Sequence, residues 1–304
     1  MRNKKSIKSF ALLWGAKLQP YLYVSLAVII VGTLILYPLI KNIINSLSTD
    51  QQFLAGGEIS FVGFENYKNA WKQGLLQIAL KNSFMFTIIT VIASFISGFG
   101  AALLINFVNR GKAIYRVLIA LPWVISPIVA GIAWNRLLAG RFGYVNYALQ
   151  KIGIISEPIA WLANTDTALP SVIVANIWRV LPFTMIILLA GLKGVSKELE
   201  ESAVVYGAGP WQVFRHVTVP QMKKIIVIVV LLNFTWNFNQ FDIVQVMTKG
   251  GPINSTMVLP VLIKKLAFDN LRIGTASALA IILAVILLVL SVLYLAVIER
   301  DERS

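Results

Sequence analysis

Cysteine is absent from the sequence, and histidine occurs once, at His216. A thiol nucleophile, a disulfide scaffold and a cysteine-based zinc site all need cysteine, and the HExxH zinc motif needs two histidines. These absences exclude the commonest thiol and metal chemistries. We therefore expect no catalytic residue and no metal ligand in this chain.

Charged residues are also scarce. They make up 13% of the 304 residues, whereas 58% of the residues are hydrophobic, and soluble domains carry about 25% charged residues. The mean hydropathy is +0.77. A net charge of +14 would suggest nucleic-acid binding in a soluble protein, but here the charges fall between long apolar runs. The composition predicts a multi-pass membrane protein that binds no nucleic acid.

Six apolar runs are each long enough to cross a bilayer core of about 30 Å. Lipid offers the backbone no hydrogen-bond partners, so each run must be helical. The predicted fold is all-α, with six transmembrane helices at 21–44, 84–108, 117–138, 168–192, 225–247 and 273–298. Four prolines should interrupt the third and fourth of them, namely Pro122, Pro127, Pro170 and Pro182.

An even number of spans puts both chain termini on one side, and the positive-inside rule makes that side cytoplasmic. The basic N-terminal segment 1–20, the loop 193–224 and the tail 299–304 then lie inside a bacterial-type inner membrane, and the membrane domain covers 21–298. Residues 6–18 have the pattern of an amphipathic helix in the membrane interface.

The second half of the fifth predicted helix is too polar to face lipid. Four side chains follow the i, i+3, i+4, i+7 spacing of one helix face: Asn233, Trp236, Asn237 and Gln240. Amides hydrogen-bond hydroxyl groups as donors and as acceptors, and an aromatic face can pack on a sugar ring. The pattern favours a path for a neutral polyhydroxylated ligand. The alternative is that these amides bond neighbouring helices.

The fourth predicted helix carries one charge near its middle, Arg179. A charge there costs about 2.5 to 3.5 kcal/mol on insertion scales, so it should face the bundle interior or a watery cavity. Two explanations are open. Arg179 could pair with Asp242, the only acidic residue inside a predicted span, or it could receive an anionic ligand such as a phosphate or a carboxylate.

Local signals divide the loop 193–224 into two short helices. Ser196 suits the N-cap of the first helix, and Gly207 can close it in a left-handed conformation. Pro210 suits the first turn of the second helix, which Pro220 should stop before the fifth span. The hairpin would either dock on a cytoplasmic partner or pack on the chain's own helices, through Leu199, Ala203, Tyr206, Trp211, Phe214 and Val217.

At this loop the sequence resembles the permease subunits of binding-protein-dependent ABC importers. Their signature reads EAA, three residues, G, nine residues and I-x-L-P, and its spacing is kept by Glu201, Ser202, Ala203, Gly207, Val217, Thr218, Val219 and Pro220. Ser202 replaces the first Ala, while Val217 and Val219 replace Ile and Leu. Tyr206 stands where the family usually has Asp.

Two further stretches resemble the carbohydrate branch of that family, with its maltose-type and glycerol-phosphate-type subunits. Residues 61–67, FVGFENY, are similar to the family's FVGLxNY. Residues 248–256, TKGGPINST, are similar to its T-x-GGP-x-x-x-T, and Ala267 with Phe268 matches its later AF pair.

The resemblance implies a transport subunit without a cofactor of its own. Its partners would be a second related permease, two subunits that bind ATP-Mg and hydrolyse ATP, and an extracytoplasmic solute-binding protein. The family's coupling helix implies ATPase docking at Glu201, Ala203, Gly207 and Pro220. Matching the maltose-type segments implies carbohydrate contacts at Asn176, Arg179, Val180, Phe183, Asn233, Trp236, Asn237 and Gln240, with Arg179 in place of an apolar Leu.

The residues themselves agree with an energy source outside the chain. Gly111 and Lys112 are followed by Ala113, so the phosphate-binding motif G-x-x-x-x-G-K-[ST] is missing, and the spans hold no carboxylate and histidine relay. We predict the permease subunit of an ATP-driven ABC importer that moves a sugar, oligosaccharide or sugar-alcohol derivative by alternating access. The alternative is a self-sufficient secondary transporter or channel for a polar solute.

Overall fold

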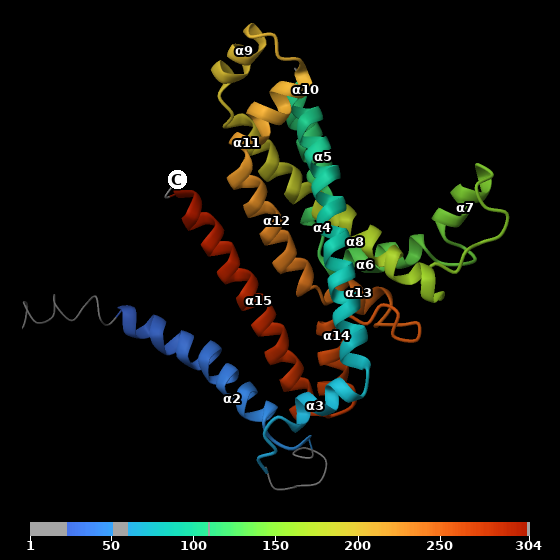
Figure 1. Cartoon of the computed structure of the whole chain (residues 1–304). Coiled ribbons are helices and arrows are strands. Elements are labelled where there is room, and N and C mark those ends of the chain that lie inside the picture. The colour runs from blue at the N-terminus through green and yellow to red at the C-terminus, as the bar shows by residue number, and fades with distance from the viewer. Residues whose placement is uncertain (1–22, 51–59, 109, 303–304) are drawn as a thin grey trace, which may run out of the picture.

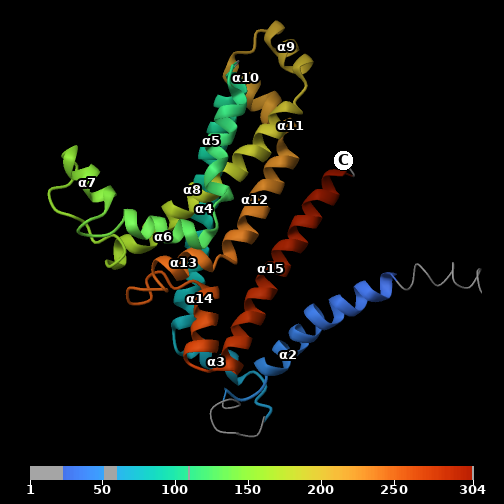
Figure 2. The same cartoon turned by 180° about the vertical axis from the view of Figure 1, so that it is seen from behind.

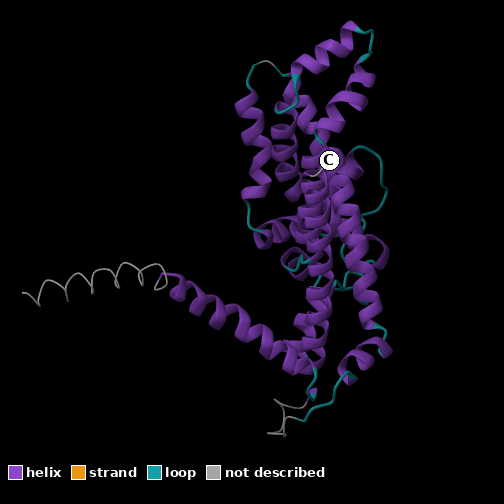
Figure 3. Ribbon diagram, turned by 60° about the vertical axis from the view of Figure 1, so that its left-hand side comes forward, coloured by secondary structure: helices purple, strands orange, loops and turns teal. Residues whose placement is uncertain are grey.

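The computed structural model describes residues 23–50, 60–108 and 110–302. The expected interfacial helix at 6–18 lies outside this part of the chain. The described residues are helical apart from loops and one isolated bridge between Ser48 and Phe61 (Figure 3). In chain order the elements are η1 (Gly32–Leu36), α2 (Tyr37–Ser46), α3 (Glu65–Lys72), α4 (Leu75–Phe107), α5 (Lys112–Val124), α6 (Pro127–Leu137), α7 (Tyr144–Lys151), α8 (Thr165–Lys193), α9 (Lys197–Val205), α10 (Pro210–Val213), η3 (Phe214–Thr218), α11 (Val219–Gln221), α12 (Lys223–Phe238), α13 (Asp242–Met247), α14 (Leu259–Lys264), η4 (Lys265–Asp269) and α15 (Ile273–Glu302).

Four helices in the described residues are long and apolar enough to cross a membrane alone: Tyr23–Ser46, Leu75–Phe107, Thr165–Lys193 and Ile273–Ala296. Two further candidates are bent pairs. Lys112–Val124 meets Pro127–Leu137 at 93°, and Pro210–Gln221 meets Lys223–Phe238 at 68°. The all-helical prediction is confirmed, and by length and composition the described residues hold four candidate spans, or six if each bent pair is one span.

The predicted third span, 117–138, is not one helix. α5 ends at Val124, and α6 begins at Pro127. Between them Ile125 and Ser126 are extended, with ψ of 131° and 139°, because a proline disfavours the helical conformation in the residue before it. Only Pro127 breaks a helix in this way. The other three predicted interruptions, Pro122, Pro170 and Pro182, lie inside continuous helices.

The predicted fifth span, 225–247, is also wrong in extent. α12 ends at Phe238, with Asn239 as its C-cap, and the chain turns before α13 begins at Asp242. Asparagine side chains compete for backbone hydrogen bonds, and this favours a helix end. α13 then packs against α6 instead of continuing the axis of α12.

The membrane helices form an elongated bundle in which α4 lies along α8, and α12 contacts both (Figure 1). The α9–α11 segment caps one end, and α3 with α14 lies at the other. The helix that ends in α2 leans away from the bundle and meets it near the start of α15, as the opposite view also shows (Figure 2). None of the residues in its most apolar stretch is buried.

Small residues allow the close contact between α4 and α8. Ser94, Gly98 and Ala102 are all buried on the same face of α4. A Cβ atom added at Gly98 would lie 3.0 Å from the Cβ of Thr184 and 3.1 Å from the backbone nitrogen of Met185. Backbones that approach this closely gain dispersion contacts, which drive helix association where lipid removes the hydrophobic effect.

The FVGFENY stretch ties the end of the first helix to α3. The side-chain amide of Asn66 donates to the carbonyls of Ser46 at 2.9 Å and Ser48 at 2.7 Å. The hydroxyl of Tyr67 donates to the Ser46 hydroxyl at 2.9 Å. Nearby, Asp50 accepts the backbone N–H of Thr275 at 2.7 Å and pairs with Arg272 at 3.0 Å. The FVGFENY stretch thus joins the first helix to α3, and Asp50 joins the same region to the start of α15.

The TKGGPINST stretch folds into a compact loop between α13 and α14. The Thr248 and Thr256 hydroxyls lie 2.7 Å apart, and Thr256 donates to the Gly251 carbonyl at 2.7 Å. Asn82 of α4 donates to the carbonyls of Asn254 and Met257 at 3.1 and 3.2 Å. The loop is thereby held against α4.

Gly98→Ala should destabilise the α4 and α8 contact by about 1–3 kcal/mol, because the new methyl group has no space. Gly100→Ala is the matched control on the same helix. A Cβ there meets nothing within 4 Å, and alanine favours a helix over glycine by about 0.5–1 kcal/mol. Thermal unfolding of the purified chain should show a lower Tm for the first variant only. Equal Tm values for both variants would contradict the close packing.

Candidate functional site

The predicted amides of α8 and α12 are hydrogen-bonded to one another. Asn176 Nδ2 donates to Asn237 Oδ1 at 2.6 Å, and Asn237 Nδ2 donates to the Asn233 carbonyl at 2.7 Å. Asn233 Nδ2 donates to the hydroxyl of Thr184 at 3.2 Å. The three asparagines are at most 3% exposed. In this conformation they join the two helices, as the interhelical alternative requires.

Arg179 lies at the edge of this amide cluster. Its Nη2 donates to Asn176 Oδ1 and to Gln240 Oε1, each at 3.3 Å. Among the described residues no salt bridge of 4.0 Å or less includes Arg179, so the pair with Asp242, one of the two alternatives for this charge, is not formed. The two neutral contacts are long for hydrogen bonds to a charged donor.

Aromatic rings continue this edge by one helical turn. The rings of Phe183 and Trp236 lie 4.7 Å apart, and Trp123 of α5 lies 5.7 Å from Phe183. Trp236 is 51% exposed and Trp123 is 45% exposed. Trp123 was missed by the sequence reasoning, because its neighbours lie on other helices and no local spacing connects them.

The eight residues predicted to contact a ligand thus fall into two groups. Asn176, Val180, Asn233 and Asn237 are buried inside the described chain. Arg179, Phe183 and Trp236 lie on the edge that the described chain leaves partly open. Gln240, which is 9% exposed, follows the end of α12 and connects the two groups through Arg179.

The first helix of the α9–α11 hairpin has both predicted caps. Ser196 is the N-cap, and its hydroxyl accepts the backbone N–H of Leu199. After the last turn Gly207 has a φ of +86°. Its N–H bonds the Val204 carbonyl at 2.9 Å, and the Ala208 N–H bonds the Ala203 carbonyl at 3.0 Å. These two bonds define a Schellman motif, which needs glycine at its left-handed position.

The second helix of the hairpin does not stop at Pro220. Pro220 lies in the first turn of α11, where a missing N–H costs little, and the wide turn η3 precedes it. The helix instead ends at Gln221, with the buried Met222 as its C-cap, and the chain bends by 68° into α12. The predicted stop at Pro220 is therefore displaced by one residue.

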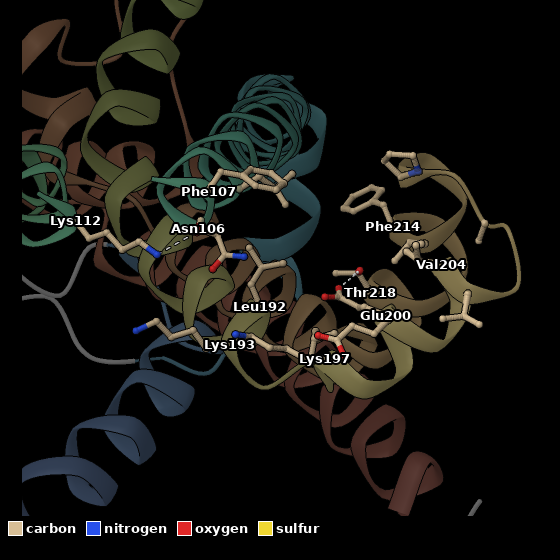
Figure 4. Close-up of a pocket in the computed structure, with 17 residues that line it drawn as sticks. Asn106, Phe107, Lys112, Leu192, Lys193, Lys197, Glu200, Val204, Phe214 and Thr218 are labelled. Carbon is tan, nitrogen blue, oxygen red and sulfur yellow. Dashed lines mark hydrogen bonds between the residues drawn. The ribbon is translucent and has the colours of Figure 1, made fainter. Parts of the chain in front are cut away.

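Side chains join the two helices of the hairpin. The hydroxyl of Thr218 donates to Glu200 Oε1 at 2.7 Å, and Gln221 Oε1 accepts the backbone N–H of Ser196 at 3.0 Å. Figure 4 shows the contact of Glu200 with Thr218 beside a groove of about 1070 Å³. The groove separates α9 from the ends of α4 and α8, and Lys112, Lys193 and Lys197 also line it.

The apolar side chains of the hairpin are only partly covered by the described chain. Phe214 packs on Phe99 of α4, with ring centroids 5.7 Å apart. Leu199, Tyr206 and Trp211 are 54%, 89% and 67% exposed. Packing on the chain's own helices therefore accounts for Phe214 but leaves the tip of the hairpin uncovered.

A double-mutant cycle tests whether the amides hold α8 on α12. Asn176→Ala and Asn237→Ala should each destabilise the chain by about 1–3 kcal/mol, because each leaves a buried partner unsatisfied. The free energy of unfolding that the double variant loses should be smaller than the sum of the losses in the two single variants. Thr235→Ala is the control, because Thr235 bonds only the Leu231 carbonyl of its own helix, and its effect should add to that of Asn176→Ala. Additive losses in both cycles would contradict the contact.

The chain is similar over most of its length to named transport permeases. A probable ABC transporter permease protein of Brucella suis is 33% identical over 285 residues, which cover 94% of this chain and 98% of the relative. The trehalose/maltose transport system permease protein MalF of Thermococcus litoralis is 28% identical, over 91% and 92% of the two chains. The sulfoquinovosyl glycerol transport system permease protein SmoG of Agrobacterium fabrum is 29% identical, over 95% and 92%.

A solved structure has the same fold. It is a bacterial ABC transporter involved in the import of the acidic polysaccharide alginate, with a TM-score of 0.76, 22% identity and 99% of both chains covered. The family model of the binding-protein-dependent transport system inner membrane component matches residues 109–301, which include α8, the hairpin and α12. The chain belongs to this family of inner membrane transport components.

Proposed function

We propose that the chain is one of two permease subunits of an ATP-driven importer of a carbohydrate, and that the solute passes along the edge formed by Arg179, Phe183 and Trp236. The observation that carries this proposal is that aromatic rings and polar groups lie side by side along that edge. Exposed aromatic rings, which suit the apolar face of a sugar, lie beside amide and guanidinium groups, which suit its hydroxyls. Relatives named for trehalose/maltose and for sulfoquinovosyl glycerol support the carbohydrate class.

The partners we propose are a second, related permease, two ATP-binding subunits and an extracytoplasmic solute-binding protein. The large exposed apolar surface of the first helix needs lipid or a second permease to cover it. The C-terminal end of α15 points toward the end of the bundle that carries the hairpin (Figure 1), which agrees with a cytoplasmic C-terminus. We place the N-terminus on the same side.

The hairpin is the proposed site of ATPase docking, through Glu201, Ala203, Gly207 and Pro220. Glu201 and Pro220 are exposed, and Ala203 and Gly207 form the Schellman motif. Because Glu200 and Gln221 link α9 to the second helix, and that helix bends at Met222 directly into α12, a displacement of the hairpin is passed to α12. α12 carries Trp236, so the movement reaches the solute path. Alternating access requires two conformations of the subunit that contact the solute differently, and a movement of α12 would interconvert them.

Partner dependence tests the importer directly. The tagged chain is extracted from its native membrane in mild detergent, co-purifying proteins are identified by mass spectrometry, and the recovered assembly is reconstituted for uptake of maltose, trehalose and larger oligosaccharides. We expect a second permease and an ATP-binding subunit, and uptake that stops when ATP is withheld. Recovery of the chain alone, with uptake that ignores ATP, would identify a self-sufficient transporter instead.

Gly207→Val should leave the assembly intact but lower solute-stimulated ATP hydrolysis at least about tenfold, because a β-branched residue resists the left-handed conformation. Gly207→Asn is the matched variant. Asparagine tolerates this conformation, so it should keep most of the stimulation. The measurement is ATPase activity of the reconstituted complex with and without solute-loaded binding protein. Wild-type stimulation of ATP hydrolysis in Gly207→Val would contradict the proposed role of the Gly207 cap in coupling.

A further inference from the structure

We infer that the carbohydrate carries an anionic group, and that Arg179 is the residue that binds it. The inference rests on the proposed function and narrows its substrate class to sugars or sugar-alcohol derivatives with a carboxylate, phosphate or sulfonate group. The guanidinium of Arg179 has no charged partner in the described chain. Its partners in the described chain are neutral amide oxygens, at 3.3 Å each.

The guanidinium has unused donors. Both observed contacts share Nη2, while Nε is buried and has no hydrogen-bond partner. Nη1 makes no hydrogen bond within the described residues and is not among their buried unpartnered atoms, so it is accessible. Arginine binds carboxylate and phosphate groups best when two of its donors engage them together. The accessible edge of Arg179 is therefore available to an oxyanion.

The chain does not neutralise this charge by a direct contact. The described residues place no carboxylate oxygen within 4.0 Å of a guanidinium nitrogen of Arg179. Asp242, one of the two partners considered for Arg179, occupies the first turn of α13 and makes no direct contact with it. Charges at membrane depth normally pair or mark a substrate path. The missing direct pair and the accessible donors of Arg179 together favour the substrate path.

The neighbours of Arg179 fit an anionic sugar better than a simple anion. Arg179 and Gln240 form one contact between α8 and the end of α12, at 3.3 Å. Phe183 and Trp236 form the next contact, at 4.7 Å between ring centroids. Phe183 follows Arg179 by four residues, and Trp236 precedes Gln240 by four, so the two contacts lie about one helical turn apart. A sugar ring on the aromatic pair would place an attached oxyanion at the guanidinium.

The test uses the complete importer, with its partner permease, ATP-binding subunits and binding protein, in liposomes. The probes are neutral oligosaccharides and their matched uronate, phosphate and sulfonate counterparts, measured as ATP-dependent uptake at limiting concentration. We expect the wild type to prefer an anionic probe over its neutral counterpart by about tenfold or more. Arg179→Gln should lower anionic uptake by about the same factor and lower neutral uptake by a clearly smaller factor, so that the preference for the anionic probe is lost. Arg179→Lys, which keeps the charge but loses the two-donor geometry of the guanidinium, should retain only part of the anionic uptake and more of it than Arg179→Gln.

Controls separate binding from structure. Arg136→Gln removes an exposed arginine of α6 and should change neither class of uptake. An equal loss of neutral and anionic uptake in Arg179→Gln would mean that Arg179 only supports Asn176 and Gln240, and would overturn the inference. A wild type that prefers neutral probes would also overturn it while leaving the proposed carbohydrate import intact. Uptake of no carbohydrate at all would refute both.

Discussion

The hydrogen bond between Asn176 and Asn237 is the interaction on which the packing of α8 against α12, and with it the proposed solute path, depends. Each amide is buried in a helix that must cross lipid, where no water is present to hydrogen-bond an unsatisfied polar group. Satisfying one amide with the other fixes α8 against α12 in one register. The close packing of α4 on α8 at Gly98 then completes a three-helix core whose outer edge carries the aromatic rings.

In that register, α8 and α12 present different residues on their inward and outward faces. The inward asparagines hold the helices together, and the outward Arg179, Phe183 and Trp236 stay available to a solute. The same two helices flank the hairpin, which is stiffened by the bond of Thr218 with Glu200 and by the Schellman cap at Gly207. The proposed solute contacts and the proposed partner contacts therefore lie on one continuous segment of the chain, and a movement of the hairpin would be passed along that segment.

Features encoded by neighbouring residues could be predicted from the sequence. The helical class, the caps at Ser196 and Gly207 and the polar face of α12 all follow from local spacing. Hydropathy located the apolar runs but could not place their breaks, because it counts side chains and not backbone bonds. The prolines placed one break correctly, before Pro127, whereas Pro122, Pro170 and Pro182 lie inside continuous helices. The contact of Arg179 with Gln240 was also beyond local reasoning, because it depends on the turn that the chain makes after α12 ends at Phe238.

The division of the site into a buried and an open group is most directly tested by chemical accessibility. Because the chain has no cysteine, single replacements Trp236→Cys and Asn233→Cys can be labelled in the assembled complex with a membrane-impermeant maleimide, applied to inside-out and right-side-out vesicles. The account predicts labelling at position 236, slowed by transported carbohydrate, and little labelling at 233. Equal labelling of both positions, or labelling at 236 that carbohydrate does not slow, would contradict it.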